Sequence, residues 1–180
     1  LSDATTGTSG SHNVGIGSNA LDAQQAGGNG NIGLGENALT DLTTGDYNVA
    51  LGSSALANVT DSDNNIGIGR IAGFNITSGT RNIAIGYGTL QGADTENDNI
   101  AIGYASLGGT VTGEYNVMLG NYTGDSLTSG SNNVAVGHQA FTGGTGMQNV
   151  CIGTSAGKVM TNNNQQTLVG YEAGKAIDSG

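Results

Sequence analysis

The sequence has no proline or tryptophan, a single cysteine and only four basic residues, against fourteen acidic ones. With a formal net charge of −10 and no cluster of cations, we expect neither a nucleic-acid partner nor binding to anionic lipid. No apolar run approaches the about 20 residues that a membrane-spanning helix needs, so we expect no membrane insertion. The lone Cys151 cannot form a disulfide within the chain. The chain starts at Leu1 without an initiator methionine, and we interpret it as a mature product or an excised segment.

Glycine, by contrast, is abundant, with 34 residues in 180, while charged residues make up only 10%. High glycine content is one mark of disorder, yet disordered chains usually carry many charges and few branched aliphatic residues. Here valine, isoleucine and leucine recur at fixed places along the chain. This regularity predicts an ordered structure, although not an ordinary globular domain.

The dominant feature is an internal repeat, the pentapeptide Asn-(Val/Ile)-x-(Ile/Leu/Val)-Gly. Its copies begin at Asn13, Asn31, Asn48, Asn65, Asn82, Asn99, Asn116, Asn133 and Asn149, and a degenerate tenth copy begins at Gln166. Successive copies start 17 residues apart, except for one step of 18 and one of 16. A small residue follows three positions after each closing glycine, often with Leu or Phe next, and a glycine commonly stands three positions before the asparagine. Each unit therefore reads as a strand, a glycine turn, a short second strand and a polar turn.

Unit length and spacing indicate how the copies are arranged. Seventeen residues are too few for a pair of helices, and each glycine would cost a helix about 1 kcal/mol relative to alanine. The pentapeptide alternates with the period of a strand, and identical strands at one interval stack most simply in parallel. We predict an all-β fold, a parallel β-solenoid of about ten coils, as one domain over residues 1–180. Stacked asparagines are expected to form a hydrogen-bonded ladder.

The two faces of the repeated strand are both apolar. Alternation places Val14 and Ile16 on one face and Gly15 on the other. The residue between the two aliphatics is never charged or hydroxylated, and down the repeats it is Gly15, Gly33, Ala50, Gly67, Ala84, Ala101, Met118, Ala135, Cys151 and Leu168. A lone solenoid should show one polar face, so the pattern predicts that neighbouring chains cover one of them. Because small residues allow backbones to approach closely, the interface candidates are Ala84, Ala101, Met118, Ala135, Cys151 and Leu168.

The copies starting at Asn82, Asn99 and Asn133 resemble the repeats of trimeric autotransporter adhesin heads of the Yersinia adhesin type, and similar repeats occur in phage and virus tail fibres. The resemblance covers nearly the whole chain. It implies a left-handed parallel β-roll that forms a homotrimer, lies outside a cell or on a virion, and attaches to a host or surface through glycan or protein. The unit here is longer than the typical adhesin-head unit, and glycine replaces the central residue at Gly15, Gly33 and Gly67.

Catalytic and metal-binding groups are scattered by the repeat. His12 and His138 are seven coils apart, so they cannot share one site. Two acidic groups, Asp61 with Asp63 and Asp94 with Glu96 and Asp98, lie in turns, where solvation is the simpler interpretation and calcium binding the sharper one. The sequence thus predicts a non-enzymatic chain with no cofactor and no resident metal.

An exposed column follows the closing glycine, and it contains Tyr87, Tyr104 and His138. These three residues are the candidates for contact with a surface ligand such as a host glycan, because exposed aromatics can stack on sugars. Packing between neighbouring coils explains them equally well. Two other functions are weighed against the attachment fibre. One is a tailspike that binds or cleaves polysaccharide, which would need paired carboxylates in a groove, and the other is an ice-binding solenoid, which would display threonine ladders.

Overall fold

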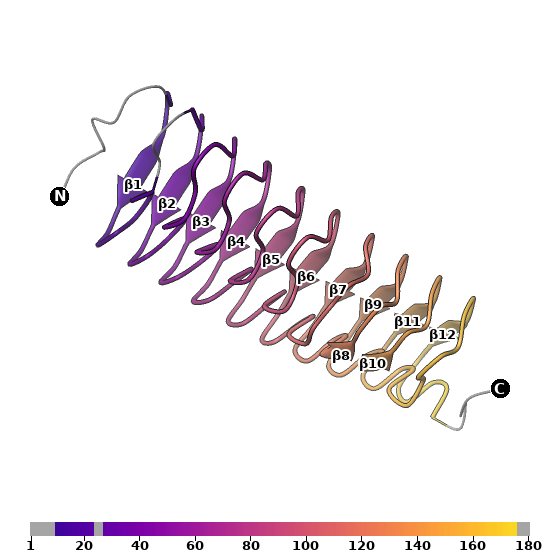
Figure 1. Ribbon diagram of the computed structural model, residues 1–180. Helices are drawn as coiled ribbons and strands as arrows, with labels where there is room; N and C mark the ends of the chain where they lie inside the picture. Colours follow the sequence, from indigo (N-terminus) through magenta and orange to yellow (C-terminus); the bar gives the residue numbers. More distant parts are fainter. Residues whose placement is uncertain (1–9, 24–26, 176–180) are drawn as a thin grey trace.

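A computed structural model describes residues 10–23 and 27–175, and in this part of the chain all regular structure is β. One parallel sheet of ten strands runs the length of the molecule, as Figure 1 shows, with one strand from each coil. Its strands, in spatial order, are β1 (Val14–Ile16), β2 (Ile32–Leu34), β3 (Val49–Leu51), β4 (Ile66–Ile68), β5 (Ile83–Ile85), β6 (Ile100–Ile102), β7 (Val117–Leu119), β9 (Val134–Val136), β11 (Val150–Ile152) and β12 (Thr167–Val169). The predicted parallel β-solenoid is confirmed.

Equivalent residues of successive coils pair directly. In β5 and β6, for example, Ile83 lies opposite Ile100 and Ala84 opposite Ala101. The irregular steps of 18 and 16 residues leave this register unchanged, because the turns absorb the difference. The prediction of a second strand in every unit is wrong for most coils. Such a strand forms only as β8 (Ser126–Leu127) and β10 (Gly143–Gly144), which pair with each other, and turns replace it elsewhere in the described residues.

An asparagine directly precedes nine of the ten strands of this sheet, buried from Asn31 to Asn149, and these residues form the expected ladder; Gln166 takes the place before β12. The backbone N–H of each one donates to Oδ1 of the asparagine in the preceding coil, at 2.8 to 3.1 Å from Asn31 to Asn149. Each Nδ2 also donates to a turn carbonyl in the following coil, at 2.6 to 3.0 Å. Each asparagine therefore links its coil to the preceding one through its backbone N–H and to the following one through its side chain, and it satisfies backbone groups that burial would otherwise leave unpaired.

Glycine ends each strand for a geometric reason. From Gly17 to Gly170 the glycines that close the strands adopt φ between 124° and 138°, a backbone conformation that residues with a side chain rarely adopt. A Cβ added to Gly86 would lie 2.2 Å from the carbonyl oxygen of Gly103 in the next coil. Close stacking of coils therefore requires glycine at this position.

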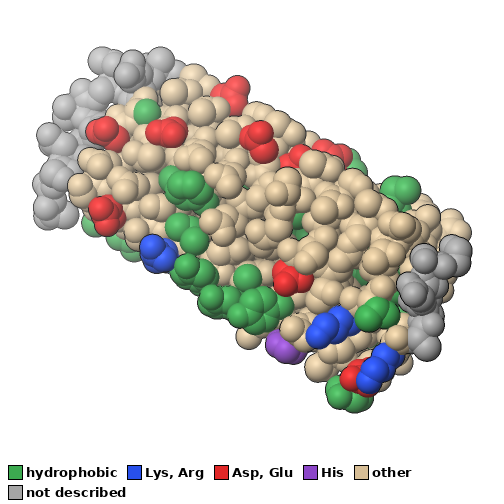
Figure 2. Space-filling model, turned by 60° about the horizontal axis from the view of Figure 1, so that its bottom comes forward, with side chains coloured by type: hydrophobic (Ala, Val, Ile, Leu, Met, Phe, Trp, Pro, Cys, Tyr) green, Lys and Arg blue, Asp and Glu red, His purple; other side chains and the backbone are tan. Residues whose placement is uncertain are grey.

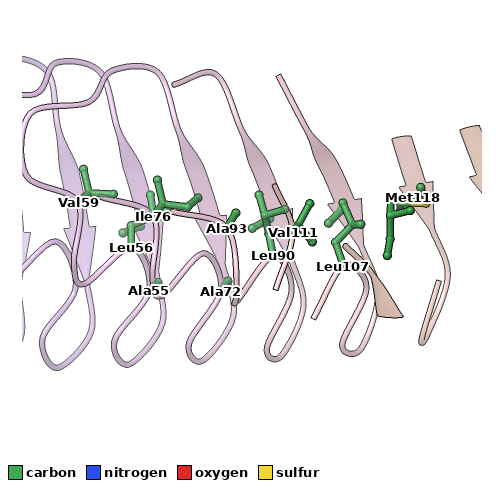
Figure 3. Close-up of a cluster of buried hydrophobic side chains, with 14 of the residues drawn as sticks. Ala55, Leu56, Val59, Ala72, Ile76, Leu90, Ala93, Leu107, Val111 and Met118 are labelled. Carbon is green, nitrogen blue, oxygen red and sulfur yellow. The ribbon is translucent and has the colours of Figure 1, made fainter. Parts of the chain in front are cut away.

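The core is a narrow column of side chains inside the coils, shown in part in Figure 3. Two core positions of each coil are matched in size, the central strand residue and the residue six positions later, while alanines and further aliphatic residues such as Val59 and Ile76 complete the core. Small strand residues are paired with large partners, as in Ala101 with Leu107 and Ala135 with Phe141. Larger strand residues are paired with glycine, because a side chain would find no room there. A Cβ added to Gly124 would lie 3.1 Å from Met118 Sδ, and one added to Gly157 would lie 2.6 Å from Cys151 Sγ. The volume of the two positions is thus balanced within the coil.

The coil that carries β4 departs from this pairing, because both of its positions are glycine. Leu56 of the preceding coil fills the space, since an added Cβ would lie 2.7 Å from Leu56 Cγ at Gly67 and 2.6 Å from Leu56 Cδ2 at Gly73. Balance of volume therefore extends across neighbouring coils, as close packing of protein interiors requires.

Candidate functional site

The outer face of the ten-stranded sheet consists of the first and third residues of each strand. In this face, nineteen of the twenty side chains are Val, Ile or Leu, and Thr167 is the exception. None of them is buried, and Val14, Ile16 and Leu34 are each 46% exposed. An unbroken aliphatic surface of this kind is a mark of contact with another molecule.

The six interface candidates lie on the opposite side of the strands. Ala84, Ala101, Met118, Ala135 and Cys151 are fully buried within their own coils, and Leu168 is half-buried against the same core. The prediction that these side chains contact neighbouring chains is therefore wrong. The alanines are small because each shares a narrow interior with a leucine or phenylalanine, whereas the larger residues share it with a glycine, so residue size here reflects the coil's own interior and not the approach of another backbone. The apolar face left uncovered is the one that carries the larger aliphatic residues.

Aromatic side chains line one edge of this sheet. The rings of Tyr87 and Tyr104 stack with centroids 5.2 Å apart, and Tyr104 and Tyr122 are 5.3 Å apart at an angle of 59°. His138 meets Tyr122 edge-on at 6.1 Å. Arg70 lies over the other side of Tyr87, at 5.6 Å from the ring centroid. We call the continuous row of Arg70, Tyr87, Tyr104, Tyr122 and His138 the tyrosine ladder. Figure 2 shows a row of hydrophobic side chains along one edge with a histidine at its end.

Tyr122 was not among the residues that the sequence pattern singles out. Asn121 occupies the expected column position, and its Oδ1 accepts a hydrogen bond from the backbone N–H of Tyr104 at 2.9 Å. The ring comes instead from the next residue, Tyr122, which has a left-handed backbone with φ of 56°. A column defined by one fixed spacing cannot reveal this shift, although a tyrosine beside the column is a signal.

Of the other exposed tyrosines in the described coils, Tyr171 follows the closing glycine of β12, in the same column as the ladder but two coils beyond its end. Tyr47 and Tyr115 lie on the opposite edge of the sheet, each directly before the asparagine that precedes β3 or β7. Between them on that edge, the Arg81 guanidinium donates to both carboxylate oxygens of Asp98, at 2.6 and 2.8 Å. This contact lowers the pKa of the Asp98 carboxyl and raises the pKa of Arg81.

The acidic turns use their carboxylates within the fold. Asp63 Oδ1 accepts from the backbone N–H of Asp46 at 2.7 Å, and Glu96 Oε2 accepts from the backbone N–H of Asp94 at 2.7 Å. Thr77 Oγ1 donates to the Asp94 carboxylate. Within residues 10–23 and 27–175, no three His, Cys, Asp or Glu side chains are grouped so that they could hold a metal ion.

His12 and His138 belong to the coils that carry β1 and β9, and the structure does not bring them together. His12 Nδ1 lies 3.0 Å from Ser11 Oγ. Burial raises the pKa of the Cys151 thiol to about 11, so the thiolate form needed for nucleophilic chemistry is disfavoured. In the described part of the chain, no helix is long and apolar enough to span a bilayer.

Comparison with known proteins gives no relationship: no family model, no curated protein and no solved structure matches this chain. The functional proposal therefore depends on the surfaces of the molecule. Two stand out, namely the aliphatic outer face and the tyrosine ladder at its edge.

Proposed function

We propose that this chain is a structural and adhesive segment of an extracellular fibre, displayed on a cell surface or a virion, in which three chains pack together through the outer face of the sheet. The uncovered aliphatic face is the observation that carries the proposal. Its twenty side chains match the about 20–30 residues per side of a stable protein interface. The resemblance to trimeric adhesin-head and tail-fibre repeats supports the number of chains and a left-handed coil.

Rigidity supports the fibre role. Every coil is joined to the next by parallel strand hydrogen bonds, by the asparagine ladder and by turn contacts such as Thr60 N–H to Thr77 O at 3.0 Å. Ten coils at a spacing of about 4.8 Å give a rod about 48 Å long. A rod of this kind holds surface groups in fixed positions at a distance from its point of attachment, which suits an attachment protein more than an enzyme.

Native mass spectrometry and light scattering test the assembly. The wild-type chain is expected to have the mass of three chains at micromolar concentration. In the double variant Ile85→Lys and Ile102→Lys, two ammonium groups lie on the outer face, and we expect the mass of a single folded chain because burying them is costly. Thr110→Lys is the matched control, since Thr110 is exposed in a turn outside the sheet, and it should remain assembled. A wild-type chain that stays a monomer would refute the proposal.

A further inference from the structure

The tyrosine ladder has no structural role that the repeat requires. At the equivalent positions of other coils the chain has Ser18, Glu36, Ser53 and Thr154, with Tyr171 in the last coil, and all these coils stack in the same register. The consecutive coils from β4 to β9 carry Arg70, Tyr87, Tyr104, the Asn121–Tyr122 pair and His138 at this position. Half of the six tyrosines of the chain are gathered on this short stretch of one edge. Such a concentration indicates a binding surface.

We propose that the tyrosine ladder binds an uncharged linear polysaccharide that lies parallel to the long axis of the rod. This inference rests on the proposed attachment function and names the class of molecule attached. From Arg70 to His138 the ladder spans four coil steps, or about 19 Å, which accommodates several sugar units. Tyr87, Tyr104 and Tyr122 are 41%, 46% and 38% exposed, so rings and hydroxyl groups are both within reach of a ligand.

The chemistry of the ladder suits sugar hydroxyls. It offers three phenol groups, the Arg70 guanidinium and the His138 ring, which supply both hydrogen-bond donors and acceptors, and beside its end Gln139 Oε1 accepts a hydrogen bond from Lys158 Nζ at 2.7 Å. Tyr122 stacks flat on neither neighbour, at 59° to Tyr104 and 88° to His138, and sugar C–H groups can pack on such a ring. Tyr87 and Tyr104, which do stack, contribute ring edges and hydroxyl groups.

A polymer fits the arrangement better than a small compound. The ladder follows an edge of the molecule, where a small ligand would touch few groups. A polysaccharide repeats the same weak contact at each coil, and linked contacts raise the overall affinity. The net charge of −10 disfavours an acidic polymer, since the only cations at this surface are Arg70 within the ladder and Lys158, which contacts Gln139 beside its end, in the part of the chain that the structure describes.

Affinity electrophoresis and isothermal titration calorimetry on the full chain test the inference, with soluble glucomannan, hydroxyethyl cellulose and dextran as neutral probes and polygalacturonate as the acidic one. We expect at least one neutral polymer to bind, and Tyr104→Ala and Tyr122→Ala each to weaken it about tenfold. Tyr115→Ala is the matched control, because Tyr115 is at least as exposed as Tyr104 and Tyr122 but lies on the opposite edge, and the affinity of this variant should be unchanged.

Circular dichroism on the same samples shows whether each variant is folded, and mass measurement shows how many chains it contains. Absence of binding to every neutral probe, preference for polygalacturonate, or equal loss in the Tyr115 control would overturn the inference. If a trimeric wild type binds no glycan, the inference fails while the fibre assembly stands. If a monomeric wild type binds through Tyr104, the assembly fails while the ladder site stands.

Discussion

The two faces of the repeated strand are both apolar, yet they differ in what packs against them. On the inner face, the central strand residue is matched by a partner six residues later, and the asparagine ladder satisfies the backbone around it. On the outer face, no segment of the described residues covers the aliphatic columns. The inner face therefore determines whether the coil forms, and the outer face determines what the coil binds. Substitutions on each side test this division.

The asparagine ladder should be the most sensitive part of the inner face. In Asn82→Ala, the Asn99 N–H and the Glu96 carbonyl lose their partners at 3.0 and 2.8 Å while remaining near the buried core. Each unsatisfied buried group costs about 1–3 kcal/mol, so we expect a loss of about 3–5 kcal/mol in unfolding free energy. Urea denaturation followed by circular dichroism measures it. The exposed Asn75→Ala should cost less than about 1 kcal/mol, and a similar loss in both variants would contradict the role of the ladder.

The balance of volume inside the coil predicts compensation between two substitutions. Met118→Ala should cost about 2–4 kcal/mol through the cavity it leaves. Gly124→Leu alone should also destabilise, since a Cβ there already lies 3.0 Å from Leu107 Cδ2 and 3.1 Å from Met118 Sδ. Combined, the two changes reproduce the Ala101–Leu107 pairing of the preceding coil, where Leu107 has φ of 49° against 63° at Gly124. A double-mutant cycle measures the coupling, and purely additive losses would contradict the pairing.

Cys151 reports on the inner face through its ionisation. Burial raises its pKa to about 11, above the value of about 8.5 in an unfolded chain. Between these values the folded state holds a proton that the unfolded state has lost, so stability should fall as pH rises from about 9 to 11. Cys151→Ala, which removes the group, should flatten this part of the stability profile. Ellman's reagent at pH 8 should react with the native thiol far more slowly than with the unfolded chain, and rapid native reaction would contradict the burial.

The sequence predicts the architecture well because the asparagine and glycine positions have strict requirements. Asn82 needs its exact place for the three hydrogen bonds of its side chain, and Gly86 needs a backbone that other residues rarely adopt, so both residue types recur at a fixed interval. Which face of the strand points into the coil is harder to predict. A column with Ala84 and Ala101 is as apolar as one with Ile83 and Ile100, and only the partners six residues later, Leu90 and Leu107, reveal which side faces inward. Tyr122 was missed because it lies one residue out of phase.

The smallest effect on folding is expected on the outer face. Ile83→Thr introduces the residue type that Thr167 already provides at the equivalent position of β12, and Thr keeps the branched shape that favours a strand. Under dilute conditions where chains are separate, the free energy of unfolding should change by less than about 1 kcal/mol. The same change should weaken assembly, because each buried methyl group lost from an interface costs about 0.8 kcal/mol and every chain carries the substitution. Sedimentation at a series of concentrations, beside urea denaturation of the same variant, separates the two effects. If Ile83→Thr destabilised the isolated chain as much as Met118→Ala, the outer face would be part of the folding core and the division between the two faces would fail.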